Sequence, residues 1–287
     1  MNRLVLAMLP LLLSTVGCTV LLTPGEAQCE TAKDCEGRGF AGAVCVKGVC
    51  EEAPVVDPVW GCLGDVVEPV PDKTKSFEFS IGLVFAGSKA PVTTATVDIC
   101  DKLDITCTGT AANFPKGLKP GPDGVLKVSL IQGFDGFVRI TSPDIVDSRV
   151  YVGRPIVAPP VVKEVWLLPP SDYDVLAAAA KLTVDPARGT AILLAHDCQG
   201  LAVGGVRFES PNADADSTEF YLTNQFPTTP PAATSTDVDG YGGFFNLPTG
   251  ASVARSIRDE DHASIGESSF QIFANTISYV QISPTPK

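Results

Sequence analysis

The sequence contains little histidine and few aromatic residues. It has only two histidines, His196 and His262, and aromatic residues make up 7% of the chain. A serine or cysteine nucleophile needs a neighbouring base, so a hydrolase of that type would have to use one of these two histidines. A glycine-rich phosphate loop between a strand and a helix is also missing. We therefore expect no catalytic residues; a structure that places either histidine within hydrogen-bond reach of a serine or cysteine in a cleft would overturn this expectation.

Basic residues and long apolar runs are scarce as well. Lysine and arginine number 21 against 33 acidic residues, which gives a net charge of −12. A chain this acidic is a poor partner for nucleic acid. The apolar run from Leu4 to Leu13, interrupted only by Pro10, is too short to span a bilayer but is typical of a secretory signal that follows a basic residue, here Arg3.

The end of this signal resembles the lipobox of bacterial lipoproteins. Residues 13–18 read LSTVGC, and small residues precede Cys18, although Thr15 stands where the family usually has leucine. The resemblance implies that residues 1–17 are removed and that Cys18 carries a diacylglycerol, so that the partner is a membrane. Thr19, which is not aspartate, is compatible with sorting to the outer membrane of a Gram-negative bacterium. The alternative is an ordinary cleaved signal, with Cys18 as a disulfide partner.

Cysteine is abundant, and its number supports export. Nine cysteines are many for a reducing compartment, and eight remain if Cys18 is lipidated, an even number that suits disulfides. After a tether over residues 18–28, residues 29–50 hold four cysteines in a segment too short to bury a core unaided. Their spacing resembles small EGF-like or Dickkopf-like knots. The four are Cys29, Cys35, Cys45 and Cys50.

We expect disulfides rather than zinc in this segment, because no histidine and no C-x2-C pair lies nearby. Of the three possible pairings we favour Cys29–Cys45 with Cys35–Cys50. The remaining cysteines are Cys62, Cys100, Cys107 and Cys198. For these we expect a short loop closed by Cys100–Cys107, and Cys62–Cys198 joining two β-regions. The rival for Cys62 is Cys100 or Cys107. No metal site and no cofactor are expected.

The rest of the chain predicts a mainly β fold. With 45% hydrophobic residues it can form real cores, and 26 glycines with 24 prolines indicate many turns. An acidic linker covers residues 51–59. A first β-sandwich is predicted over 60–169, where Phe77, Phe79 and Ile81 alternate as in a half-buried strand. Its expected strands are 76–85, 95–100, 125–130, 137–140, 150–152 and 161–168.

A linker over residues 170–186 follows, and it carries the one strong helix signal. Ser171 can cap a helix that continues through four consecutive alanines to Lys181, and Asp185-Pro186 then ends it. We expect this helix to join two separate sandwiches.

The second β-region, residues 187–287, contains the stretches AHDCQGLAVGGVRFES, STDVDGYGGFFNLPTG and TISYVQI. With these stretches it resembles the carboxypeptidase regulatory-like domain, a transthyretin-like β-sandwich. Residues 60–169 look like a more divergent copy. The expected fold is therefore two Ig/transthyretin-like antiparallel β-sandwiches after a small disulfide-rich knot and a lipoprotein signal peptide. Strands are expected at 190–196, 206–210, 220–223, 244–248, 252–257 and 268–282. Family members of this kind serve as accessory, adhesive or spacer modules.

Several weaker candidates have simpler interpretations. His196 with Cys198 lacks a third metal ligand, and His262 lies in an acidic loop. Two aspartate pairs, Asp237 with Asp239 and Asp214 with Asp216, suggest calcium but also suit solvated turns. Trp60, Trp166 and Tyr241 would give a sugar-stacking platform if exposed, although we expect the two tryptophans to pack against the core.

Together these features predict a non-enzymatic, lipid-anchored envelope protein that displays β-sandwich modules for a binding or structural role. Its soluble partner would be a protein or a glycan, whose identity the sequence does not specify. The alternative function is that of a carbohydrate- or peptidoglycan-binding accessory protein.

Overall fold

The computed structural model describes residues 27–52, 57–109, 114–159 and 164–286. The chain divides into two compact units, Met1–Val56 and Asp57–Lys287. The predicted signal peptide, Cys18 and most of the tether lie outside the described residues. Within the described part, no helix combines the length and the apolar character that a membrane crossing requires.

The smaller unit consists of one short helix and one hairpin. Its elements are α1 (Ala32–Gly37), β1 (Ala43–Val46) and β2 (Val49–Glu52). Asp34 accepts hydrogen bonds from the backbone N–H of Thr31 and Glu30, which fixes the first turn of α1. Because β2 reaches Glu52, this unit extends two residues into the segment predicted as a linker.

The larger unit is almost entirely β-structure. Its first half holds β3 (Ser76–Phe85), β4 (Thr96–Asp101), β5 (Val125–Ile131), β6 (Gly136–Thr141), β7 (Ser148–Tyr151) and β8 (Glu164–Leu167). Helix α2 (Pro170–Ala179) follows. The second half holds β9 (Gly189–Ala195), β10 (Val206–Glu209), β11 (Thr218–Thr223), β12 (Phe226–Thr228), β13 (Tyr241–Leu247), β14 (Gly250–Arg258), β15 (Ser264–Ile272) and β16 (Ile277–Ile282). The mainly β class predicted from the sequence is confirmed.

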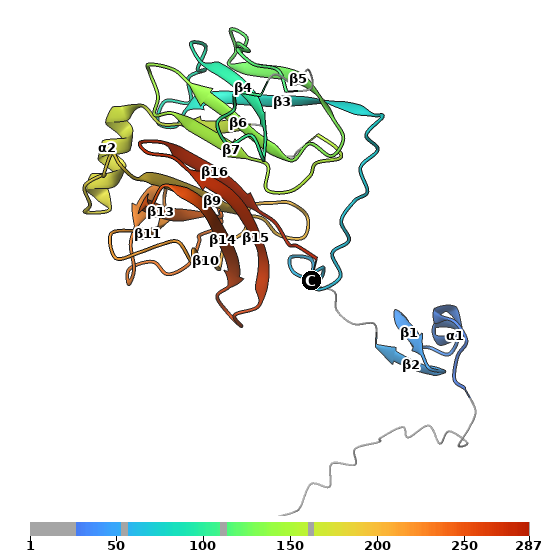
Figure 1. Cartoon of the computed structure of the whole chain (residues 1–287). Coiled ribbons are helices and arrows are strands. Elements are labelled where there is room, and N and C mark those ends of the chain that lie inside the picture. The colour runs from blue at the N-terminus through green and yellow to red at the C-terminus, as the bar shows by residue number, and fades with distance from the viewer. Residues whose placement is uncertain (1–26, 53–56, 110–113, 160–163, 287) are drawn as a thin grey trace, which may run out of the picture. The chain divides into compact units, whose positions relative to one another are not determined.

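One eight-stranded sheet runs through both halves of this unit. Its order is β12-β11-β13-β9-β16-β7-β6-β4, and two three-stranded sheets, β10-β14-β15 and β5-β3-β8, complete the fold. Strand β16 lies between β9 and β7 and is parallel to both (Figure 1). The expectation of two separate sandwiches is therefore wrong, because the last strand of the chain joins the two halves edge to edge.

Two hydrophobic cores form on opposite faces of the eight-stranded sheet. The C-terminal core, which includes Leu193, Phe208 and Ile272, lies under β10-β14-β15. The N-terminal core, which includes Leu83 and Val138, lies under β5-β3-β8. Neighbouring residues of one strand serve different cores: on β6, Phe137 belongs to the C-terminal core and Val138 to the N-terminal core. This follows from the two-residue period of a strand.

Helix α2 covers the part of the sheet that β5-β3-β8 leaves open. Tyr173 and Ala177 pack there with Phe220 and Phe245, in what we call the helix-side cluster. The helix begins one residue before the predicted Ser171, and that serine does not cap it; Pro170 occupies the first turn instead. It ends at Ala179, and Lys181 adopts a left-handed conformation that stops further turns.

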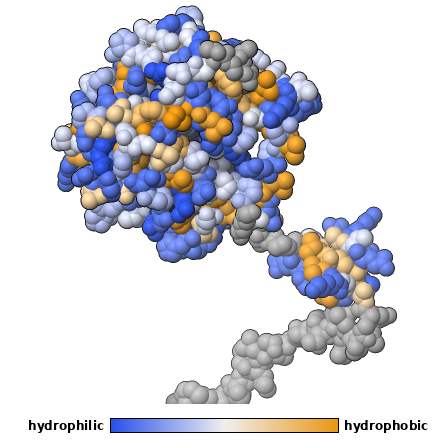
Figure 2. Space-filling model, viewed as in Figure 1, coloured by the Kyte–Doolittle hydropathy of each residue, from blue (hydrophilic) through white to orange (hydrophobic). Residues whose placement is uncertain are grey.

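The visible face of the molecule is mostly hydrophilic, with apolar side chains scattered among polar ones (Figure 2). Such scattering is ordinary for a protein surface and does not by itself indicate a function.

The continuous sheet predicts that both cores of the larger unit unfold together. Leu83 and Leu193 are fully buried, one in each core. Replacing either by alanine typically costs about 2–5 kcal/mol and should lower one shared thermal midpoint by on the order of 10 °C. Differential scanning calorimetry of Leu83→Ala and Leu193→Ala would test this. A second transition that stays at the wild-type temperature in either variant would show that the halves unfold independently.

Candidate functional site

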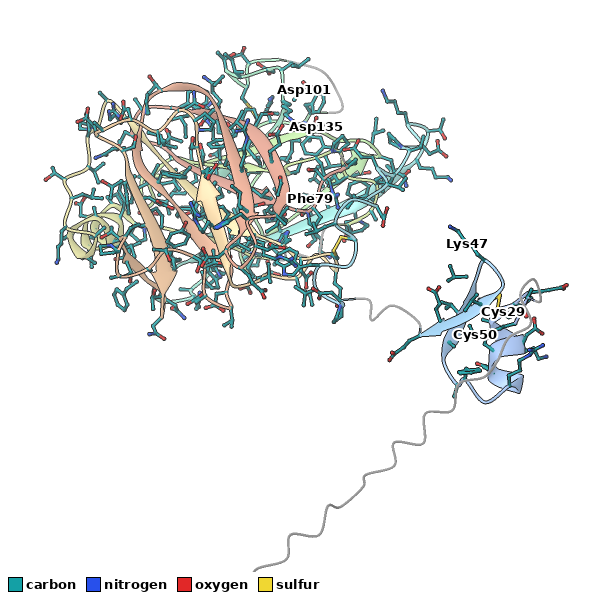
Figure 3. The ribbon with its side chains drawn as sticks, turned by 90° about the horizontal axis from the view of Figure 1, so that it is seen from below. Cys29, Lys47, Cys50, Phe79, Asp101 and Asp135 are labelled. Atoms are coloured by element: carbon teal, nitrogen blue, oxygen red, sulfur yellow. A yellow bond between two sulfur atoms is a disulfide. The ribbon has the colours of Figure 1, made fainter. Side chains whose placement is uncertain are left out.

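Two disulfides form the centre of the smaller unit. Cys29 pairs with Cys45 and Cys35 with Cys50, with Cα–Cα distances of 5.7 and 5.6 Å. Cys29 and Cys50 lie inside this unit, and Lys47 lies at the turn of its hairpin (Figure 3). The sulfur atoms of Cys29, Cys35 and Cys50 lie close enough to suggest a metal site. Because all of them are bonded in disulfides, they offer no thiolate to a metal.

Two further disulfides hold the larger unit. Cys100 pairs with Cys107 across a short loop, and Cys62 pairs with Cys198, 136 residues away. The loop-entropy model gives the longer bond a stabilisation of about 5 kcal/mol. It fastens the segment around Trp60 and Leu63 to the C-terminal core, against which both side chains pack. All four pairs are those favoured from the sequence, and the rival pairing of Cys62 is not formed.

His196 lies in a small cavity of about 150 Å³ near the end of β9. It is only 6% exposed, and its Nδ1 atom lies 3.3 Å from Ser283 Oγ. Burial lowers the pKa of His196; nearby Asp197 opposes this effect and Arg154 adds to it. Sequence reasoning missed Ser283, which carries no signal apart from its position just after a strand.

This contact is the outcome that stands against the expectation of a non-enzyme. A catalytic triad also needs a group that orients the base, and the described residues supply none by a hydrogen bond. Asp197, whose charge acts on His196, uses Oδ1 to accept the backbone N–H groups of Gln199 and Leu201 at 2.8 and 2.9 Å. Among the described residues, no carboxylate forms a hydrogen bond with His196. The geometry therefore gives a histidine–serine contact and not a triad.

His262 lies where the sequence predicts, in the exposed turn between β14 and β15. Its backbone N–H donates to Arg258 O at 2.9 Å. The neighbouring Asp261 accepts from Arg258 Nε at 2.7 Å, and this ion pair holds the pKa of Asp261 far below its usual range. The carboxylate of Asp261 is thus paired with Arg258. No hydrogen bond joins it to His262 in the described part of the chain.

The two aspartate pairs have protein partners of their own. Arg188 lies 2.6 Å from Asp214 and 3.5 Å from Asp216, so a guanidinium already supplies the positive charge at this loop. It holds the pKa of Asp214 far below its usual range. Asp237 accepts the backbone N–H of Asp239 at 3.0 Å, as expected of a solvated turn. The calcium interpretation therefore gains no support from the described residues.

The three aromatic residues considered for sugar stacking do not form one exposed platform. Trp60 packs against the C-terminal core, whereas Trp166 and Tyr241 stack on each other with ring centroids 5.6 Å apart. Lys89 Nζ lies 3.2 Å from the centroid of the Trp166 ring. The aromatic surface of Trp166 is thus used within the protein.

Trp166 and Tyr241 instead line a cavity that the sequence did not reveal. It has a volume of about 310 Å³ and lies between α2, β8 and the face of the eight-stranded sheet. We call it the sheet-face cavity. The residues that line it come from elements throughout the larger unit, so no local sequence pattern could predict it.

The sequence matches no protein-family model and no curated protein. Solved structures with distant similarity include the Bacillus anthracis TIE protein (14% identity, TM-score 0.24). This similarity covers 73% of the present chain but only 34% of the TIE protein. The shaft pilin SpaA of Lactobacillus rhamnosus GG has 11% identity and a TM-score of 0.22 over 74% of this chain and 99% of the pilin.

BcpA, the major pilin subunit of Bacillus cereus, has 10% identity and a TM-score of 0.24 over 73% of this chain and 69% of the pilin. Values this low carry no argument about function, which rests on the geometry of this chain. The resemblance of residues 187–287 to the carboxypeptidase regulatory-like domain stays a prediction.

His196 predicts an acid-sensitive stability. The unfolded chain binds a proton at this histidine with a pKa near 6.5. Burial lowers the pKa of His196 in the folded chain, which therefore binds this proton less readily. Unfolding therefore takes up a proton, and the free energy of unfolding should fall as the pH drops from about 7 to about 5. Denaturant titrations at both pH values would show a smaller loss in His196→Gln. His262→Gln, which alters the exposed histidine, should keep the wild-type loss; an equal loss in all three proteins would contradict the assignment.

Proposed function

We propose that this chain is a non-enzymatic, lipid-anchored protein of the cell envelope, whose β-sandwich body serves a binding or structural role. The observation that carries the proposal is the disulfide set: all eight cysteines after Cys18 pair with one another. Disulfides of this number form and persist in oxidising compartments, which supports export.

The same pairing supports lipidation of Cys18. The sequence has nine cysteines, and the eight that follow Cys18 need no further partner. The alternative role of Cys18 as a disulfide partner would require a second chain or rearrangement of a formed bond. A diacylglycerol with a further acyl chain would give durable membrane attachment.

The two histidines bear on the non-enzymatic part of the proposal in different ways. His262 is exposed beside an aspartate already paired with Arg258, which favours it. His196 contacts Ser283, which stands against it, but no carboxylate among the described residues forms a hydrogen bond that would orient the ring. The alternative function, carbohydrate or peptidoglycan binding, would be favoured by exposed aromatic faces. Because Trp166 stacks on Tyr241 and Trp60 packs against a core, these residues favour the first proposal.

Lipidation predicts that the protein enters the detergent phase in a cloud-point partition. Cys18→Ala should remain in the aqueous phase, because no other attachment to the membrane is proposed. Thr19→Ala, which alters the neighbouring residue and keeps the cysteine, is the matched control and should partition like the wild type. If the wild type and Cys18→Ala both remain aqueous, the anchor does not exist.

The non-enzymatic proposal predicts that Ser283 is unreactive. A fluorophosphonate labels serines that an adjacent base activates, and no carboxylate in the described part of the chain orients His196 by a hydrogen bond. We expect no labelling of the native protein above that of its heat-denatured form. Labelling of the native protein that disappears in Ser283→Ala and in His196→Gln would instead identify a catalytic serine.

A further inference from the structure

We propose that the sheet-face cavity binds a small, uncharged hydrophobic molecule. This goes beyond the proposed function and does not depend on the lipid at Cys18. The cavity, of about 310 Å³, lies at the low end of the range for ligand sites.

The cavity reaches the middle of the eight-stranded sheet. Ile192 on β9 and Tyr279 on β16 belong to its two central strands, yet both are only half-buried. Their neighbours Leu193 and Val280, on the opposite face, are fully buried in the C-terminal core. The lower burial of Ile192 and Tyr279 shows that their face of the eight-stranded sheet is incompletely covered. The sheet β5-β3-β8 covers one part of this face and ends at β8, and α2 covers another part.

The side chains that line the cavity favour an apolar ligand. Besides Ile192, the apolar lining includes Leu168, Leu176, Phe220, Leu222 and Phe245. Three of the four hydroxyl groups in the lining already have partners: Tyr173 Oη lies 2.6 Å from Thr190 Oγ1, and Tyr279 Oη donates to Trp166 O at 2.7 Å. A polar ligand would therefore lose its hydration without gaining these hydrogen bonds.

The rim of the cavity disfavours an anion. Two carboxylates, Glu164 and Asp172, belong to its lining. The nearby cation, Lys89, lies against the ring of Trp166. A fatty acid or another apolar anion would bring its negative charge towards the two carboxylates, whereas an uncharged molecule of the same length would not.

Apolar side chains also mark the opening. Val175 on α2 is 59% exposed and Phe226 on β12 is 58% exposed, although both line the cavity. Helix α2 and strand β12 contact each other. A tight turn with Asn224 and Gln225 in left-handed conformations positions Phe226 at the start of β12. An apolar ligand would cover these two side chains on binding.

The experiment uses the full chain carrying Cys18→Ala, so that no lipid of its own competes for the cavity. The probe is N-phenyl-1-naphthylamine, an uncharged dye that fluoresces in apolar surroundings. We expect saturable binding with one dye per chain. 1-Decanol should displace the dye at a concentration at least about tenfold lower than decanoate, which has the same chain length and a negative charge.

Leu222→Trp adds volume inside the cavity and should weaken dye binding at least about tenfold. Val238→Trp is the matched control, because Val238 is 81% exposed and does not line the cavity, and its affinity should equal that of the parent. Circular dichroism melts would verify that both variants fold. If Leu222→Trp does not fold, the exposed rim variant Phe226→Ser replaces it and should weaken binding severalfold.

Absence of saturable binding would overturn the proposal. Unchanged affinity in a folded Leu222→Trp variant would also overturn it, since the dye would then occupy another surface. Displacement by decanoate as effective as that by decanol would overturn the assignment of an uncharged ligand. None of these outcomes bears on membrane attachment, which the detergent partition tests separately.

Discussion

The arrangement of the larger unit depends on the placement of one strand, β16. It is the last strand of the chain, yet it pairs in parallel with β9 and with β7 and so joins two sets of strands that would otherwise form separate sheets. Every other pair in the eight-stranded sheet is antiparallel. Because both partners are far away in sequence, their pairing requires closure of long loops, which slows folding.

The two faces of β16 explain why one side of the sheet is closed and the other hollow. Val280 and Ile282 point into the C-terminal core. The long strands β14 and β15, of nine residues each, cover this core. Tyr279 points to the opposite face, where the short strand β8 and a ten-residue helix share the covering. Two short elements do not fill the space over a wide sheet. The sheet-face cavity is thus a consequence of the topology and not of any single residue.

The individual strands could be predicted from the sequence because their signals are local. The alternation of Phe77, Phe79 and Ile81 gave β3 with the same bounds as the structure, 76–85. What failed was the assembly: the run predicted as one strand over 268–282 is two strands, β15 and β16, which belong to different sheets. Strands that pair in parallel are not joined by a tight turn, so no turn residues in the sequence mark them as partners. A hydrophobic strand can therefore be recognised in the sequence although the strands beside it in the sheet cannot.

The candidate sites divide along the same line. Disulfides as such could be predicted from the number of cysteines and the compartment, but the pairing was a choice among open alternatives, and for Cys62 the rivals were Cys100 and Cys107. The contact of His196 with Ser283, and the cavity around Trp166, arise only when distant strands align. The position of Trp60 also depends on the alignment of distant segments. Trp60 precedes β3, the first strand of the larger unit, but packs against the C-terminal core. The apolar face that the topology leaves uncovered lies where β16 joins the two halves, and this is why we propose a binding site there and not at a motif of the sequence.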